Sequence, residues 1–287
     1  MKIRRRILLF ALLLSVCTGA WADPALWKIQ RGDGTVYLFG TVHVLPKGTT
    51  WHYAALDDAL AASDELYVEL VDDDQATMQP LVTQYGIDLA HPLSAELDPG
   101  DEQRLQAAAQ TAGIPAQALD AMRPWLAAVT LTVAPLIKAG FDPDSGADKQ
   151  LRADFAARGK PVEGLETAAQ QIRYFAELPQ PVEISMLRNT LDDYDKAVTE
   201  TNALVSDWQH GDVDAIAALE NSDMREKYPL LYKTLLTERN GRWAQQIMQL
   251  LQRHQTIFIA VGAAHLAGPD DVQAQLDKLG IHARRVH

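Results

Sequence analysis

Two short segments of the chain share a design that is suited to catalysis or to metal binding. In each, a run of apolar residues precedes the pattern Gly-x-x-His, which reads Gly40-Thr41-Val42-His43 in the first segment and Gly262-Ala263-Ala264-His265 in the second. A glycine straight after a strand lets the backbone turn sharply and lets another group approach it. Neutral imidazole is a common ligand of zinc and a usual general base. His43 and His265 are therefore candidates for one shared site, and a capping or core role for each histidine stays open.

Two carboxylates and one arginine extend this candidate site. The segment 65–71 predicts a buried strand that ends at Glu69. A buried carboxylate is costly unless it is protonated, paired or metal-bound. A surface position beyond the strand is the alternative for Glu69. Glu166 follows a short predicted strand and could equally start the next helix, whose N-terminus favours negative charge. Arg239 could hold a substrate carboxylate, stabilise an oxyanion, or pair with a neighbouring acid such as Glu238.

Water is the most economical nucleophile for a hydrolytic site in this chain. Cys17 is the only cysteine and lies within residues 1–22, so the chain without this segment has neither a cysteine nucleophile nor a thiolate ligand. The sequence contains no Gly-x-Ser-x-Gly elbow, P-loop or dinucleotide-binding glycine pattern. A bound metal would acidify a water molecule, and a carboxylate such as Glu69 or Glu166 would take its proton.

The elements that position these residues come from both ends of the chain. Strands are predicted at 26–30, 35–39, 65–71, 160–166, 256–261 and 283–286. The pair Asp33-Gly34 is a hairpin-turn signal between the first two strands. We therefore expect an α/β fold whose sheet is formed from N- and C-terminal strands, with helical insertions at about 72–147 and 167–254. No linker or repeat divides residues 23–287, so we expect a single domain whose ligand site lies beyond the carboxyl ends of the strands.

Within the insertions, helix boundaries follow from the capping residues. Asp98 and Pro99 predict the start of a helix that Gly113 ends, and Pro124 predicts the start of another that ends near Gly140. The second of these helices carries an apolar stripe that we expect to be core, formed by Leu126, Val129, Val133 and Ile137. The histidines outside the two motifs have no comparable setting. We expect His254 on the apolar face of its helix and His282 on the surface.

The first 22 residues have the form of a secretory signal peptide, with a cationic start, an apolar run at 7–14 and the small-residue pattern Ala20-Trp21-Ala22. The apolar run is too short for a permanent membrane anchor, so we expect a periplasmic or secreted mature protein. Cleavage removes four of the 26 Lys and Arg residues and leaves 22 against 38 Asp and Glu residues, a net charge of −16. A chain this acidic is not expected to bind nucleic acid.

Taken together, the motifs resemble the TraB/GumN/Tiki family. The resemblance rests on the Gly-x-x-His motif at His43, the strand ending in Glu69, Gly164-Leu165-Glu166-Thr167, the pair Arg239-Asn240 before Trp243, and Val261-Gly262-Ala263-Ala264-His265-Leu266. These features span almost all of residues 23–287. The second motif departs from the first in that it lacks the hydroxyl group of Thr41.

The resemblance implies a ChaN-like and erythromycin-esterase-like α/β fold and a metal-dependent hydrolase, because animal Tiki members are divalent-metal-dependent proteases. It implies that His43, His265 and Glu69 bind an ion of the Mn, Co or Zn class, and that Glu69, Glu166 and Arg239 take part in catalysis. The expected reaction cleaves an amide, peptide or ester bond of a peptide or small-molecule substrate with metal-activated water. A non-catalytic haem, iron or small-ligand binding protein and a protein-interaction scaffold are the alternatives.

Overall fold

The computed structural model describes residues 23–287, so the predicted signal peptide lies outside the described residues. It contains a six-stranded mixed sheet with the strand order β6-β4-β7-β2-β1-β8. Its strands are β1 (Leu26–Arg31), β2 (Gly34–Thr41), β4 (Glu65–Val68), β6 (Val162–Gly164), β7 (Thr256–Gly262) and β8 (Arg284–Arg285). The predicted α/β fold, with a sheet built from both ends of the chain and helical insertions, is confirmed.

The register of the sheet brings four strand ends to one edge. β6, β4, β7 and β2 are neighbours and run parallel, whereas β1 and β8 are antiparallel to their partners. Thr41 at the end of β2 lies opposite Gly262 at the end of β7, and Val68 at the end of β4 lies opposite Gly164 of β6. The residues that directly follow these four strands therefore start from the same edge of the sheet.

Both faces of the central strands are buried, as their continuous apolar sequence requires. In β7, Phe258 and Ala260 pack into the hydrophobic cluster on one face, whereas Ile257 and Ile259 pack into the cluster on the other face. This alternation follows from the two-residue period of a strand. The apolar packing on both faces gives the parallel strand ends a rigid support.

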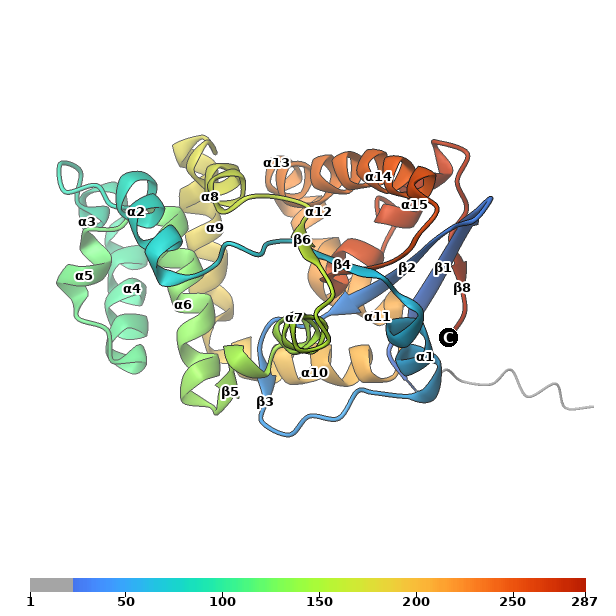
Figure 1. Cartoon of the computed structure of the whole chain (residues 1–287). Helices are drawn as coiled ribbons and strands as arrows, with labels where there is room; N and C mark the ends of the chain where they lie inside the picture. Colours follow the sequence, from blue (N-terminus) through green and yellow to red (C-terminus); the bar gives the residue numbers. More distant parts are fainter. Residues whose placement is uncertain (1–22) are drawn as a thin grey trace, which may run out of the picture.

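The first half of the chain contributes most of a helical layer that lies to one side of the sheet (Figure 1). The helices of this half are α1 (Ala54–Ala62), α2 (Gln75–Gly86), α3 (Leu93–Glu96), α4 (Pro99–Ala112), α5 (Ala116–Asp120), α6 (Pro124–Lys138) and α7 (Ala147–Ala157). Of these, α2 to α6 belong to the layer, whereas α1 and α7 lie next to the sheet (Figure 1). The predicted caps of α4 are present, since Asp98 accepts hydrogen bonds from Gly100 and Asp101 and Gly113 has a φ of 76°. A small second sheet that the sequence pattern does not reveal pairs β3 (Leu45–Pro46) with β5 (Phe141–Asp142).

Helices also dominate the second half, as predicted. They are α8 (Ala168–Ala176), α9 (Gln180–Asp193), α10 (Ala197–Gln209), α11 (Val213–Ile216), α12 (Asp223–Lys227), α13 (Pro229–Tyr232), α14 (Glu238–Leu250) and α15 (Val272–Asp277). Two π-helical segments, η3 (Ala217–Ser222) and η4 (Lys233–Thr237), interrupt this run, and a short 3₁₀ segment, η6 (Ala263–Leu266), follows β7. Within residues 23–287, no helix has the length and apolar character to cross a membrane.

Two of the sequence-based predictions about packing are wrong. The apolar stripe of α6 is core only at its start, where Leu126 is buried, because Ile137 near its end is 46% exposed. His254 is exposed and adopts a φ of 55°. The helical periodicity does not reach His254, because α14 ends at Leu250 and a 3₁₀ turn follows it.

Candidate functional site

The four parallel strands each deliver one polar side chain to the same edge of the sheet. His43 follows β2, Glu69 follows β4, Glu166 follows β6, and His265 lies in η6 directly after β7. The Nε2 atoms of His43 and His265 are each 3.8 Å from the same oxygen, Oε1 of Glu69. The two histidines of the Gly-x-x-His motifs thus lie on either side of one carboxylate oxygen, although most of the chain separates them in sequence.

Gly262 leaves the room that this convergence needs. A Cβ atom at Gly262 would lie 3.1 Å from Oε1 of Glu69 and 3.2 Å from Nε2 of His43, both tighter than ordinary van der Waals contact. The Gly262 N–H also donates a 2.7 Å hydrogen bond to Oε1 of Glu69. Gly40 has a comparable constraint, because its Cβ would lie 3.1 Å from Cα of Ala263. Both motif glycines therefore allow the close approach of the two segments.

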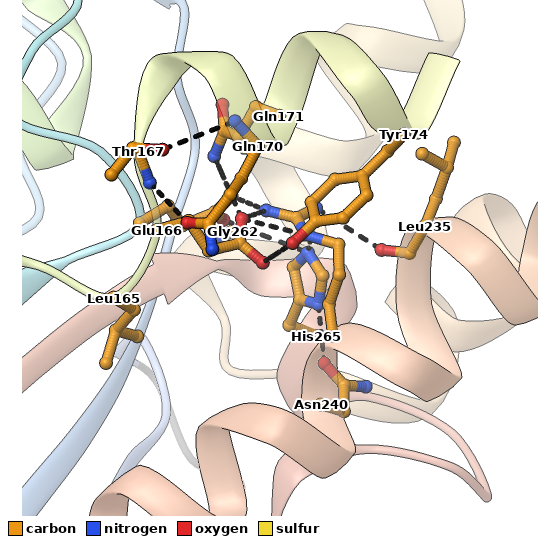
Figure 2. A network of polar contacts seen from close by, with 12 residues as sticks. Leu165, Glu166, Thr167, Gln170, Gln171, Tyr174, Leu235, Asn240, Gly262 and His265 are labelled. Carbon is orange, nitrogen blue, oxygen red and sulfur yellow. Dashed lines mark hydrogen bonds and ion pairs between the residues drawn. The ribbon is translucent and has the colours of Figure 1, made fainter. Parts of the chain in front are cut away.

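Arg239 joins the two carboxylates into one buried network. Figure 2 shows Glu166, Gln171, Tyr174 and His265 of this network. The Nη2 group of Arg239 donates to Oε2 of Glu69 at 2.5 Å and to Oε2 of Glu166 at 2.8 Å, and its Nε donates to both Glu166 oxygens at 3.1 Å. On the other side, Tyr174 donates to Oε1 of Glu166 at 3.0 Å and Gln171 donates to its Oε2 at 3.3 Å. The fork of one guanidinium thus fixes both carboxylates.

The charges of this network keep Glu69 ionised. Burial alone would raise its pKa, but the Arg239 guanidinium, the two neighbouring histidines and the Gly262 N–H together hold the pKa of Glu69 well below its usual range. Burial likewise opposes the charge of Arg239, and Glu69 and Glu166 outweigh it and raise the pKa of Arg239 further. The site therefore contains a carboxylate and a guanidinium that stay charged at all ordinary pH values.

His265 is held as a neutral ring with a defined tautomer. The Nδ2 group of Asn240 donates to the carbonyl oxygen of Asp270 at 2.8 Å, so Oδ1 of Asn240 faces the imidazole, and Nδ1 of His265 donates to it at 2.6 Å. The lone pair of the ring is then on Nε2, where Nη1 of Arg239 donates to it at 3.1 Å. Burial, together with the charges of Arg239 and His43, lowers the pKa of His265 to about 3.

His43 is the contrasting member of the pair because its side chain is 57% exposed. Its Nδ1 lies 3.1 Å from Oδ1 of Asp148, at the start of α7. Partial desolvation opposes a charge on the ring, but the hydrogen bond to Asp148 and the charge of Glu69 outweigh it and raise the pKa of His43 to about 9. The structure thus pairs a neutral histidine with one that is protonated near neutral pH.

The two π-helical segments position parts of the site. The carbonyl oxygen of Leu235 in η4 accepts a hydrogen bond from Nη1 of Arg239 at 3.2 Å. In η3, the buried Asn221 donates to the carbonyl oxygens of Ala264 and Ala267, both at 2.9 Å, and so holds the segment that carries His265. Single turns of π-helix occur often at functional sites, which fits the place of both segments here.

Sequence reasoning missed several of these residues. The side chains that orient or surround the five predicted ones are Asp148, Gln171, Tyr174, Asn221 and Asn240. Asn240 carried a signal, since it directly follows Arg239 in the motif that we had singled out. The other four lie on helices, and no local pattern marks them.

The comparisons with known proteins found relatives that match almost the whole length of the chain. The model of the TraB/PrgY/gumN family matches residues 25–285. The chain belongs to the TraB/PrgY/gumN family. It is 22% identical to an uncharacterized protein of Treponema pallidum, over 93% of this chain and 87% of the relative. It is 24% identical to the uncharacterized protein YbaP of Escherichia coli, over 88% of this chain and 92% of the relative. It is also 24% identical to a metalloprotease TIKI homolog of Amphimedon queenslandica, over 98% of this chain and 66% of the relative. No solved structure matches the chain.

The name of the Amphimedon queenslandica relative raises the question of whether the site of this chain fits a metal ion. The donor types fit, since Asp148 and Asn240 engage the Nδ1 atoms of the two histidines and so leave Nε2 as the ligand atom, an arrangement that metal-binding histidines share. In the described arrangement, however, Arg239 engages both His265 and Glu69. No group of three or more His, Cys, Asp or Glu side chains among residues 23–287 is arranged as a metal site.

Proposed function

We propose that the chain is a hydrolase that cleaves an amide, peptide or ester bond with water at the site of His43, Glu69 and His265. The observation that carries the proposal is the distance of 3.8 Å from each imidazole Nε2 to the same Glu69 oxygen, beside a glycine that leaves this space open. Membership of the TraB/PrgY/gumN family and the similarity to a protein named as a metalloprotease support the reaction class.

A divalent ion of the Mn, Co or Zn class is part of the proposal, with His43, His265 and Glu69 as its ligands. When bound, such an ion lowers the pKa of a water molecule and makes it a nucleophile near neutral pH. The depressed pKa of Glu69 makes this carboxylate a weak base when it acts alone, which is the reason to include the ion. Metal binding requires that Arg239 releases the Nε2 atom of His265.

The residues of the chain have separate roles in this proposal. Asp148 and Asn240 orient the two imidazoles, and the Gly262 N–H orients the carboxylate of Glu69. Arg239 and Glu166 hold the other oxygen of Glu69 and balance its charge. These contacts orient the three donors in advance, and the release of His265 by Arg239 is the rearrangement that metal binding adds.

Hydrolysis without a metal is a second candidate. It is favoured because Arg239 donates hydrogen bonds to Nε2 of His265 and to Glu69, two of the groups that a metal ion would need. Here the carboxylate of Glu69, although a weak base, takes a proton from the attacking water, and the imidazolium of His43 gives its proton to the leaving group. The raised pKa of His43 and the lowered pKa of Glu69 give both groups the required charge near neutral pH. Activity that resists chelators but is lost in His43→Ala would favour this second candidate over the first.

The proposed place of action is the periplasm or the cell exterior, after removal of residues 1–22. The composition of that segment supports this location, with its cationic start and short apolar run. N-terminal sequencing of the protein from a periplasmic fraction tests it, and an N-terminus at residue 23 is the expected result.

The test of the reaction class uses fluorogenic peptides and esters with chelator-treated protein, alone and with Mn²⁺, Co²⁺ or Zn²⁺. Metal should restore turnover in the parent but not in His43→Ala or His265→Ala. His282→Ala is the matched control, since its imidazole is exposed and lies 2.7 Å from the surface carboxylate of Asp277, away from the site. A strong haem absorption band in the purified protein, without turnover, would instead support a binding protein.

A further inference from the structure

Substrate can reach the site only from the side of His43 in the described part of the chain. Glu166, Arg239 and His265 are each less than a tenth exposed, and α8 covers the network on the side of Glu166 with Gln171 and Tyr174 (Figure 2). The side chain of His43, in contrast, is more than half exposed. The surface next to His43 is therefore where a substrate group must bind.

A cavity of about 330 Å³ lies at this point, and His43 and Glu69 are among the residues that line it. Its volume lies at the lower end of the range of about 300–1,000 Å³ that ligand pockets have, so it offers room for one large side chain. Its walls are mainly apolar, and the apolar residues that line it include Val44 after β2, Leu70 after β4, Val133 of α6 and Pro143 after β5. The half-buried Val133 faces this cavity on the stripe of α6 that was expected to be core.

The charged groups around the cavity already have partners of opposite charge. Lys149 pairs with Asp144 at 3.0 Å, and Asp73 pairs with Arg152 at 2.9 Å. The carboxylate of Asp148 is engaged by His43. A charged substrate group would have to compete with these pairs and lose its own hydration, whereas an apolar group gains from leaving water.

We infer that this cavity binds an uncharged apolar side chain of the substrate, next to the bond that is cleaved, and that Val133 is a specificity-determining residue. The inference rests on the proposed hydrolase function. It names the substrate class as peptides or esters with a leucine-like or phenylalanine-like group beside the scissile bond. A substrate side chain bound in this cavity would lie next to the reacting groups, because His43 and Glu69 line the same cavity.

The experiment compares matched peptides that differ at one position, with Leu, Phe, Asp or Lys beside the scissile bond. The parent should cleave the Leu and Phe peptides at least about tenfold faster in kcat/KM than the charged ones, as for other apolar pockets. Val133→Asp should abolish this preference, and the isosteric Val133→Thr should weaken it. Ile137→Asp is the matched control, because Ile137 lies one turn further along α6, is exposed and does not line the cavity.

A binding measurement separates this inference from the reaction itself. N-acetyl-leucinamide should shift the methyl signals of Val133 and Leu70 in NMR spectra of the parent, and N-acetyl-aspartamide should not. If the probe binds but no peptide is cleaved, the apolar cavity stands and the hydrolase proposal fails. Equal cleavage of all four peptides, or an unchanged preference in both Val133 variants, would overturn the inference.

Discussion

Asn240 accepts a 2.6 Å hydrogen bond from Nδ1 of His265, and its own amide is fixed by the carbonyl group of Asp270. This contact determines which nitrogen of His265 carries the lone pair. Asn240→Ala should let the ring adopt both tautomers and lower kcat by about 10–100-fold, as for other residues that orient a catalytic or ligating histidine. The ¹⁵N shifts of the ring report the tautomer directly.

The matched control for this prediction is Asn202→Ala, because the amide of Asn202 is exposed on α10 and contacts only the backbone of its own helix. Asn202→Ala should leave both kcat and the ¹⁵N shifts of His265 unchanged. A single ring tautomer that persists in Asn240→Ala would show that Asn240 does not orient the histidine.

Gly262→Ala should disturb the site because the added Cβ comes within 3.2 Å of both Glu69 and His43. We expect a loss of activity and a decrease of about 1–3 kcal/mol in the free energy of unfolding, the usual cost of an overpacked position. Gly241→Ala is the control. Nothing lies within 4 Å of its Cβ in α14, so this variant should gain about 0.5–1 kcal/mol. Urea unfolding measures both, and equal stabilities for the two variants would contradict the crowded geometry at Gly262.

Removal of Arg239 should take the guanidinium away from two buried carboxylates, Glu69 and Glu166. Arg239→Met should therefore lose about 3–5 kcal/mol of stability, the cost of breaking a buried ion pair from one side. A divalent ion that binds Glu69 and His265 would replace the lost charge. Mn²⁺ or Zn²⁺ should raise the Tm of Arg239→Met more than that of the parent, since a ligand that binds only the folded state stabilises it.

The control for the arginine variant is Arg158→Met, whose partner Asp154 lies one helical turn away on the surface of α7. Its stability should change little, and metal should affect it as it affects the parent. If metal raises the Tm of Arg239→Met no more than that of the parent, the guanidinium and the ion do not share donors.

The carboxyl group of Asp271, which is not part of the site, should make the stability of the fold depend on pH. It caps α15 by accepting a hydrogen bond from Ala274, and burial raises its pKa to about 6. Because the pKa of Asp271 is raised in the folded state, this group stabilises the fold at pH values below the ordinary carboxyl pKa near 3.8. The stabilisation is lost as the pH rises through 6. Asp271→Asn keeps a capping oxygen without the charge, so above pH 6 it should be more stable than the parent by about 1 kcal/mol, after allowance for solvent screening.

Urea unfolding at pH 4 to 8 measures this difference. Asp74→Asn is the control, because hydrogen bonds from Thr77 lower the pKa of the Asp74 carboxyl group and the variant should be less stable than the parent at pH 7. A difference between Asp271→Asn and the parent that is the same at all pH values would refute the account of this cap.

The parallel sheet explains why much of the site could be predicted. A strand, a glycine and a histidine are local features, and the carboxyl ends of neighbouring parallel strands meet at one edge. The positions of His43, Glu69, Glu166 and His265 relative to predicted strands were therefore enough to expect them at one edge. The caps of α4 were predictable for the same reason, since Asp98 and its neighbours act within a single turn.

Contacts made by helices from the insertions could not be predicted in this way. Asp148 reaches His43 from α7 and Arg239 reaches Glu166 from α14, and both contacts depend on how whole helices pack on the sheet. The periodicity of α6 indicates an apolar face but not whether another element covers it. Val133 was therefore assigned to the core, although it lines the cavity beside His43.

The most direct test of the proposed hydrolase is cleavage of a Leu-containing peptide in H₂¹⁸O, followed by mass spectrometry of the products. The account predicts one solvent ¹⁸O atom in the new carboxyl group for the parent and for His282→Ala, and no product above background for His43→Ala or His265→Ala. Product formation by His43→Ala and His265→Ala at the parent's rate would contradict the assignment of the reaction to this site.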